Sequence, residues 1–216
     1  MAKEKSKDTP QLRLKALAPE KKAQLLDPAE KEFASKGFIG ASLNNILREA
    51  GMSKGQAYYY VENKADLYSA VCERAFHRLF KKIETSEFSP QTPEEFWRDI
   101  QNFCERLIVA LNGDETLSAL GRSVYDSKQA EEALSEPLSR LQIQFNQWVE
   151  LGQLIGAIRK DIPSDLLQAI LFGVFKEIDR WFATNLSKLE NSEAMRLNAL
   201  SLELLRSLAE PKQTSN

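Results

Sequence analysis

The residues with the most evident chemistry lie between positions 42 and 64. They are hydrogen-bond donors, aromatic rings and one glycine near two predicted helix starts: Ser42, Ser53, Lys54, Gly55, Gln56, Tyr58, Tyr59 and Lys64. A lysine can donate to O6 and N7 of guanine, and a glutamine can form two hydrogen bonds with adenine. Groups at a helix N-terminus suit phosphate oxygens, because that end carries free N–H groups and partial positive charge. The set therefore predicts contact with DNA.

These residues divide into a set that should position the protein on DNA and a set that should read bases. The positioning set is Ser42, Tyr58, Lys64 and the backbone around Lys54 and Gly55. The reading set is Gln56, Lys54 and Tyr59. We expect Tyr59 to point outward, Tyr60 to be partly buried and Tyr58 to lie at the core's edge, since Tyr58 and Tyr59 should not both face away from the core.

Two short helical patterns that meet at Gly51 present these residues. The apolar positions of the first follow helical spacing, at Leu43, Ile46, Leu47 and Ala50. Ser42 can cap this helix, and Gly51 should end it, because glycine takes a left-handed conformation without a Cβ penalty. Ser53 can cap a second helix over residues 54–60. Together they predict a helix-turn-helix, whose second helix enters the major groove of DNA.

Several residue types fall at fixed offsets around this turn: Ala50-Gly51-Met52-Ser53-Lys54-Gly55, then Tyr58, Asn63-Lys64 and Leu67. Upstream stand Leu25-Leu26-Asp27-Pro28-Ala29, Phe33 and Gly37-Phe38. Over about residues 20–70 the chain closely resembles the DNA-binding domain of TetR-type (tetracycline-repressor-like) transcriptional regulators. The resemblance implies phosphate contacts at the positioning set and a homodimeric repressor that binds an inverted-repeat operator. It also implies a helical body that takes a small molecule and releases the DNA.

Four residues depart from the pattern of that family. Tyr60 stands where His is frequent and Val61 where Phe is usual. Which side chain contacts phosphate at these positions is therefore left open. Leu47 occupies a position that is usually small, and Ala57 one that is usually Leu or Ile. We interpret Leu47 and Ala57 as a compensating exchange of volume where the two helices cross, which cores tolerate when total volume is kept.

Helix-forming stretches with sparse glycine and proline predict an all-α chain. We expect a three-helix DNA-binding domain over residues 19–64 and a larger helical domain over residues 65–210, joined by a long helix from residue 64 to about 84. Residues 1–18 are polar and basic, and we expect a flexible arm. It either reaches the DNA backbone or minor groove, or is a solvated tail without specific contacts.

The first helix of the DNA-binding domain should run from about Pro19 to Lys36 and bend at Pro28, because proline lacks the N–H that its helix position requires. Gly37 should end it, and Phe38 and Ile39 should pack under the helix-turn-helix. The larger domain should contain helices over about 94–111, 115–125, up to 155, 164–186 and 192–208.

Charge is distributed unevenly along the chain. Residues 1–64 carry 12 Lys and Arg against 8 Asp and Glu, whereas the other 152 residues carry 17 against 23. A basic front on an acidic body fits DNA contact at one end of the molecule.

Aromatic residues of the larger domain are candidates for a largely apolar ligand cavity: Phe76, Phe80, Phe96, Trp97, Phe103, Trp148 and Phe172. The alternative is that most of them fill the core. Polar groups that could orient a ligand cannot be placed from the sequence: His77, Arg122, Tyr125 and Gln144.

The last two predicted helices are apolar around more of their circumference than one core requires. Residues assigned to a dimer interface are Phe175, Ile178, Trp181, Phe182, Leu200 and Leu204. In the resembled family these two helices of each subunit form a four-helix interface, and simple core packing is the alternative.

Other function classes find little support in the sequence. A lone His77 with Cys72 and Cys104 does not make a metal site, and we expect two buried thiols rather than a redox pair. No catalytic motif stands out, no cofactor is expected, and no apolar stretch suggests a membrane span or secretion signal, so the expected location is the cytoplasm. A ligand-independent regulator or activator remains the alternative, with a helical enzyme a remote one.

Overall fold

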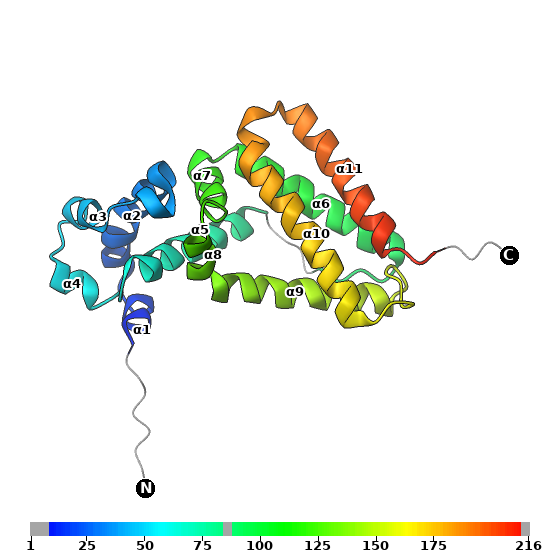
Figure 1. Ribbon diagram of the computed structural model, residues 1–216, viewed down its shortest axis with the longest axis horizontal. Coiled ribbons are helices and arrows are strands. Elements are labelled where there is room, and N and C mark those ends of the chain that lie inside the picture. The colour runs from blue at the N-terminus through cyan, green and yellow to red at the C-terminus, as the bar shows by residue number, and fades with distance from the viewer. Residues whose placement is uncertain (1–8, 84–87, 213–216) are drawn as a thin grey trace, which may run out of the picture. The chain divides into compact units, whose positions relative to one another are not determined.

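The computed structural model describes residues 9–83 and 88–212, and these residues form helices and no strand (Figure 1). The predicted all-α fold is confirmed. The helices are α1 (Pro10–Lys15), α2 (Pro19–Gly40), α3 (Leu43–Glu49), α4 (Lys54–Tyr58), α5 (Lys64–Ile83), α6 (Pro93–Asn112), α7 (Glu115–Ser123), α8 (Lys128–Ala133), α9 (Ser135–Leu154), α10 (Ser164–Asn185) and α11 (Asn191–Ala209), with a 3-10 turn η1 (Leu186–Lys188) before the last.

The chain divides into two compact units, and the division is not the linear one expected from the sequence. The first unit holds the described residues up to Phe76 together with residues 119–135. The second holds the described residues of 77–118 and those from 136 onward. The helix α5 contributes residues to both units, and the end of α7 and all of α8 belong with the N-terminal helices.

The expected flexible arm is in part a helix. Residues 1–8 lie outside the described part of the chain, but α1 follows them. Thr9 caps α1 by accepting a hydrogen bond from the N–H of Leu12, at 3.4 Å. Pro10 suits the first turn of a helix, and Leu14 is buried. Residues 10–15 of the expected arm are therefore helical, with Leu14 buried.

The helix α2 keeps Pro28 in its interior and is interrupted at Gly37, whose φ of 64° is left-handed. The sequence predicted the break at this glycine. The left-handed φ favours glycine here, and a Cβ on Gly37 would also require the carboxylate of Asp126, whose Oδ2 would lie 2.5 Å away, to move. Phe38 is buried as expected, whereas Ile39 is exposed, because the chain past the break turns only one of these neighbours inward.

The core of the first unit is aromatic at its centre. The ring of Tyr68, on α5, lies 5.0 Å from the rings of Phe33 and Phe38 on α2. Ser123 donates to the carbonyl of Leu120, so the hydroxyl of Tyr68 donates to Ser123, at 2.8 Å. This buried bond ties α5 to the end of α7 within the same unit.

An ion-pair cluster fastens α5 to α2 as well. The guanidinium of Arg74 donates to Asp27 at 2.6 Å and to the nearly buried Glu30 at 2.5 Å. A planar guanidinium can serve two carboxylates at once, which fixes the angle between the helices better than one surface pair would.

The second unit packs α11 against both α6 and α10. Its core cluster joins these helices to α9: Phe96, Trp97, Val149, Ala157, Ile158, Leu167, Leu171 and Ala209. The expected turn after α9 is present, with Gly156 at a φ of 82°. A Cβ on Gly152 would lie 2.7 Å from Cδ1 of Ile158, so α9 needs a glycine for this close packing.

Candidate DNA-binding interface

The helix α4 begins with a complete capping box. The hydroxyl of Ser53 accepts from the N–H of Gln56 at 3.3 Å, and Oε1 of Gln56 accepts from the N–H of Ser53 at 2.9 Å. Gly51 holds a φ of 62° in the turn before it, as the sequence predicted. Two N–H groups that would lack partners at the helix start are thereby satisfied.

The capping box changes the expected use of Gln56. Reading adenine with two hydrogen bonds requires both the oxygen and the nitrogen of the side-chain amide. Since Oε1 already accepts from Ser53, a two-bond contact would have to use its second lone pair while the amide stays in the capping position. With the cap intact, the exposed Gln56 side chain can offer Nε2 and that second lone pair to DNA.

Tyr58 and Tyr59 are both exposed, at 47% and 52%, and Tyr60 is partly buried. The expectation for Tyr59 and Tyr60 is confirmed, but the premise that Tyr58 and Tyr59 could not both face away from the core was wrong. The inward positions belong to Ala57 on this short helix and to Val61 shortly after it, each 1% exposed, which leaves the rings of Tyr58 and Tyr59 outside.

Lys54 and Gly55 form the exposed first turn of α4. A Cβ on Gly55 would meet no atom of the chain within 4 Å. Nothing inside the protein therefore requires glycine there, whereas an approaching phosphate would benefit from the bare backbone. Leu47 and Ala57 are both buried, and their compensation of volume stays a prediction.

Lys64 is engaged within the protein. Its Nζ donates to the carbonyl oxygens of Ile39 and Ala41, each at 3.2 Å, and lies 4.9 Å from the ring centre of Phe38. Two of the three ammonium hydrogens are thus used to tie the end of α2 to the start of α5. A phosphate contact by Lys64 would use the third.

Ser42 caps α3 by accepting from the N–H of Asn45 at 3.4 Å, as expected. Its own N–H donates to Oε1 of Glu32 on α2, at 2.9 Å. The Ser42 hydroxyl keeps its hydrogen for an outside acceptor, which is compatible with the expected phosphate contact.

The sequence did not single out Arg13 as part of this surface. Its guanidinium carbon lies 4.3 Å from the ring centre of Tyr59, and Nη1 donates to the Tyr59 carbonyl at 3.3 Å. The two residues are 46 positions apart, and the only sequence signal was the basic character of the N-terminal segment.

The aromatic residues expected to line a ligand cavity have different surroundings. Phe96 and Trp97 are buried in the core cluster of the second unit. Phe103 and Trp148 are partly buried, with ring centres 5.5 Å apart, and Phe172 packs on Phe145 at 5.4 Å. On α5, Phe76 is partly buried and Phe80 is exposed. The rings therefore do not all belong to one lining.

The polar candidates are likewise separated. His77 and Gln144 are exposed, whereas Arg122 and Tyr125 are partly buried in the first unit. Burial raises the pKa of the Cys72 thiol to about 12 and that of Cys104 to about 11, so both remain protonated near neutral pH. Both are free thiols, Cys72 buried and Cys104 partly so.

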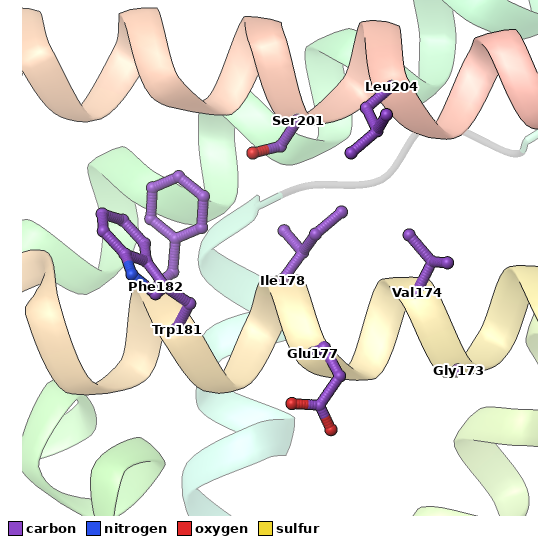
Figure 2. A pocket seen from close by; sticks show the side chains of 8 residues that line it. All are labelled: Gly173, Val174, Glu177, Ile178, Trp181, Phe182, Ser201 and Leu204. Carbon is purple, nitrogen blue, oxygen red and sulfur yellow. The ribbon is translucent and has the colours of Figure 1, made fainter.

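The helices α10 and α11 share an apolar surface. A groove of about 450 Å³ lies between them, lined by Gly173, Val174, Glu177, Ile178, Trp181, Phe182, Ser201 and Leu204. In Figure 2 the side chains of Val174 and Ile178 point toward α11, and that of Leu204 points back toward α10, whereas Glu177 points away. Of the six residues assigned to a dimer interface, Trp181, Leu200 and Leu204 are exposed and Phe175, Ile178 and Phe182 are partly buried.

The candidate interface from Ser42 to Lys64 lies within a region that matches a known protein family. Residues 25–71 match the family described as bacterial regulatory proteins, tetR family. The transcriptional repressor DhaR of a Mycobacterium species is 26% identical over 154 residues, which cover 68% of this chain and 74% of DhaR. The regulator TtgR of Pseudomonas putida is 21% identical over 212 residues, which cover 85% of this chain and 98% of TtgR.

A solved structure shares the fold of both units. The transcriptional regulator FadR of Bacillus subtilis, in complex with stearoyl-CoA, aligns with a TM-score of 0.62 at 20% identity. The alignment covers 85% of this chain and 97% of FadR. Among the helices described here, none has the length and hydropathy needed to cross a membrane.

Proposed function

We propose, from the chain's identity as a TetR-type transcriptional regulator, that it is a homodimeric repressor of an inverted-repeat operator and is released by a small molecule. The observation that carries the DNA-binding part is the exposed, doubly hydrogen-bonded start of α4. It presents Lys54 and the bare backbone of Gly55 beside the exposed rings of Tyr58 and Tyr59.

The contacts with DNA divide as follows. Lys54 and Tyr59 read base edges, since both are exposed on or beside α4. Ser42, Tyr58 and the N–H of Gly55 bind phosphate and set the register of the helix in the groove. The capping role of Ser53 and Gln56 holds the helix start in shape, and the third hydrogen of Lys64 adds a phosphate contact.

A second copy of this chain is the proposed occupant of the groove between α10 and α11. The groove is lined by exposed apolar side chains, with Trp181 45% and Leu204 58% exposed. An exposed apolar patch of this kind can meet its own copy across a two-fold axis. Two copies would present two α4 helices, which is why the operator should be an inverted repeat.

The proposed ligand is largely apolar. FadR of Bacillus subtilis, which shares the fold, was solved with stearoyl-CoA, and this chain has partly buried rings at Phe103, Trp148 and Phe172. Phe96 and Trp97 are assigned to the core instead. Release requires that the ligand bind more tightly to the arrangement that fits DNA poorly. The helix α5, which has residues in both units, is the proposed link.

Purified protein and DNA from upstream of its own gene test this function. Binding measured across a salt series should weaken steeply as salt rises, because a dimer that neutralises several phosphates releases counterions. Lys54→Ala should relax the preference for the operator over shuffled DNA. A matched surface change far along the chain, Lys188→Ala, should leave both affinity and preference unaltered. Weak binding with equal affinity for this DNA and for shuffled DNA would contradict the proposal that the chain recognises an operator there.

A further inference from the structure

A short N-terminal helix is docked beside the candidate DNA-reading helix. The helix α1 is held by its Thr9 cap and by the buried side chain of Leu14, which is 4% exposed. The preceding residue, Arg13, extends to Tyr59, the residue that follows α4. Both residues belong to the first unit, so the contact lies within one compact body.

Arg13 acts on the C-terminal end of α4. Tyr59 is the C-cap residue, and its carbonyl accepts a hydrogen bond from Nη1 of Arg13 at 3.3 Å. Carbonyl groups at a helix end lack partners within the helix and carry partial negative charge, which a cation stabilises. A residue 46 positions upstream therefore caps the helix that the capping box begins.

Such support matters because α4 has only five residues. Isolated helices shorter than about 12–15 residues are marginal in water, so a helix this short depends on its caps and its packing. Ser53 and Gln56 hold its start, Ala57 buries its inner face, and Arg13 holds its end.

Arg13 also fixes the ring of Tyr59. The guanidinium lies over the ring at 4.3 Å, and the ring of Tyr60 meets it edge-on at 5.1 Å with an interplanar angle of 88°. Tyr59 nevertheless remains half exposed. A ring that is already ordered loses less conformational freedom when it meets DNA, and less lost freedom means tighter binding.

We infer that Arg13 is a positioning residue that presents Tyr59 and α4 to DNA, an inference that rests on the proposed DNA-binding function. Its effect depends on the planar, forked shape of the guanidinium, which lysine lacks. This differs from a phosphate contact by a basic arm, for which positive charge alone would suffice.

Two variants and one control on the same helix separate shape from charge. The operator is first selected from random DNA, and Arg13→Ala should then bind it about tenfold more weakly, from the lost stacking and hydrogen bond. Arg13→Lys should lose nearly as much. Lys15→Ala removes an equal charge from the exposed side of α1 and should change affinity less than about twofold. Full affinity in Arg13→Lys would overturn the inference.

A double-mutant cycle with Tyr59→Ala identifies the residue through which Arg13 acts. Arg13→Ala in a Tyr59→Ala background should cause a smaller further loss, because only the hydrogen bond to the backbone carbonyl of residue 59 is left to lose, and both single variants should relax preference at the same base pairs. Losses that simply multiply would overturn the inference. So would a salt dependence of binding reduced by about one counterion in Arg13→Ala, since that indicates a direct phosphate contact.

Two different outcomes separate the positioning role of Arg13 from the DNA-binding function itself. Wild-type protein that selects no operator would contradict the function itself. Wild-type protein that binds an operator, with Arg13→Ala equally tight, would contradict only the inference. Thermal unfolding followed by circular dichroism should show all variants folded, and a large drop in Tm for Arg13→Lys would mean a general structural effect instead.

Discussion

Replacing Gln56 separates its capping role from a role in reading bases. In Gln56→Ala the N–H of Ser53 loses its acceptor, which lies at 2.9 Å in the intact capping box. In Gln56→Glu an acceptor remains at the same helix position, where glutamate is a common capping-box residue. The two variants therefore differ in whether the start of α4 stays capped.

The lost hydrogen bond and the weakened cap should together cost about 1 kcal/mol. For a protein of this size, that lowers Tm by about 2–4 °C if the whole fold responds. If fraying of α4 is passed on to DNA binding, affinity falls about fivefold for every sequence alike. Gln56→Glu should keep wild-type stability but bind DNA more weakly, because its carboxylate faces phosphates.

The assay combines thermal unfolding with affinity for a panel of operators that carry single base-pair changes. We predict that Gln56→Ala lowers Tm, weakens binding to all members of the panel by a similar factor, and leaves their order unchanged. Gln56→Glu controls for stability, since its Tm should match the wild type.

Loss of discrimination without loss of stability would assign Gln56 to base reading. If Gln56→Ala lost about tenfold or more of its discrimination at one base pair while keeping its Tm, Gln56 would be reading that base rather than capping the helix.

Other perturbations test the core, the backbone and the second-copy surface. Leu47→Ala, at a buried position, should lower the free energy of unfolding by about 2–5 kcal/mol in denaturant titration, and an unchanged midpoint would disprove the volume exchange. Gly37→Ala meets a φ of 64° and Oδ2 of Asp126 at 2.5 Å, so its Tm should fall, whereas Gly55→Ala, in open space, should keep it. Leu204→Glu should convert a dimer to a monomer in sedimentation velocity, and a dimer that persists would place the interface elsewhere. Cys72, its pKa raised to about 12 by burial, should resist alkylation at pH 8 until the protein unfolds, and rapid labelling of the folded protein would contradict that burial.

Local chemistry accounts for what the sequence could predict. Gly51 ends α3, and Ser42 and Ser53 cap the two helices, because each feature depends on a few neighbouring residues. The capping box is also readable from the sequence, since Ser53 and Gln56 stand three positions apart, and it indicates that Oε1 of Gln56 has a partner within the protein.

The missed features depend on contacts between distant parts of the chain. The docking of α1 rests on Leu14 and on the pairing of Arg13 with Tyr59, which no local pattern encodes. The two internal bonds of Lys64 require carbonyls more than 20 positions upstream. The grouping of residues 119–135 with the N-terminal helices likewise follows from tertiary packing.

Selection from random duplex DNA, followed by footprinting of the selected sequence, tests whether a dimer of this chain reads DNA through α4. Such a dimer should enrich an inverted repeat, with both half-sites protected and two chains bound per duplex. Lys54→Ala should weaken protection of both half-sites together. Selection that enriches no sequence, or a single protected site bound by one chain, would contradict a dimer that reads DNA through α4.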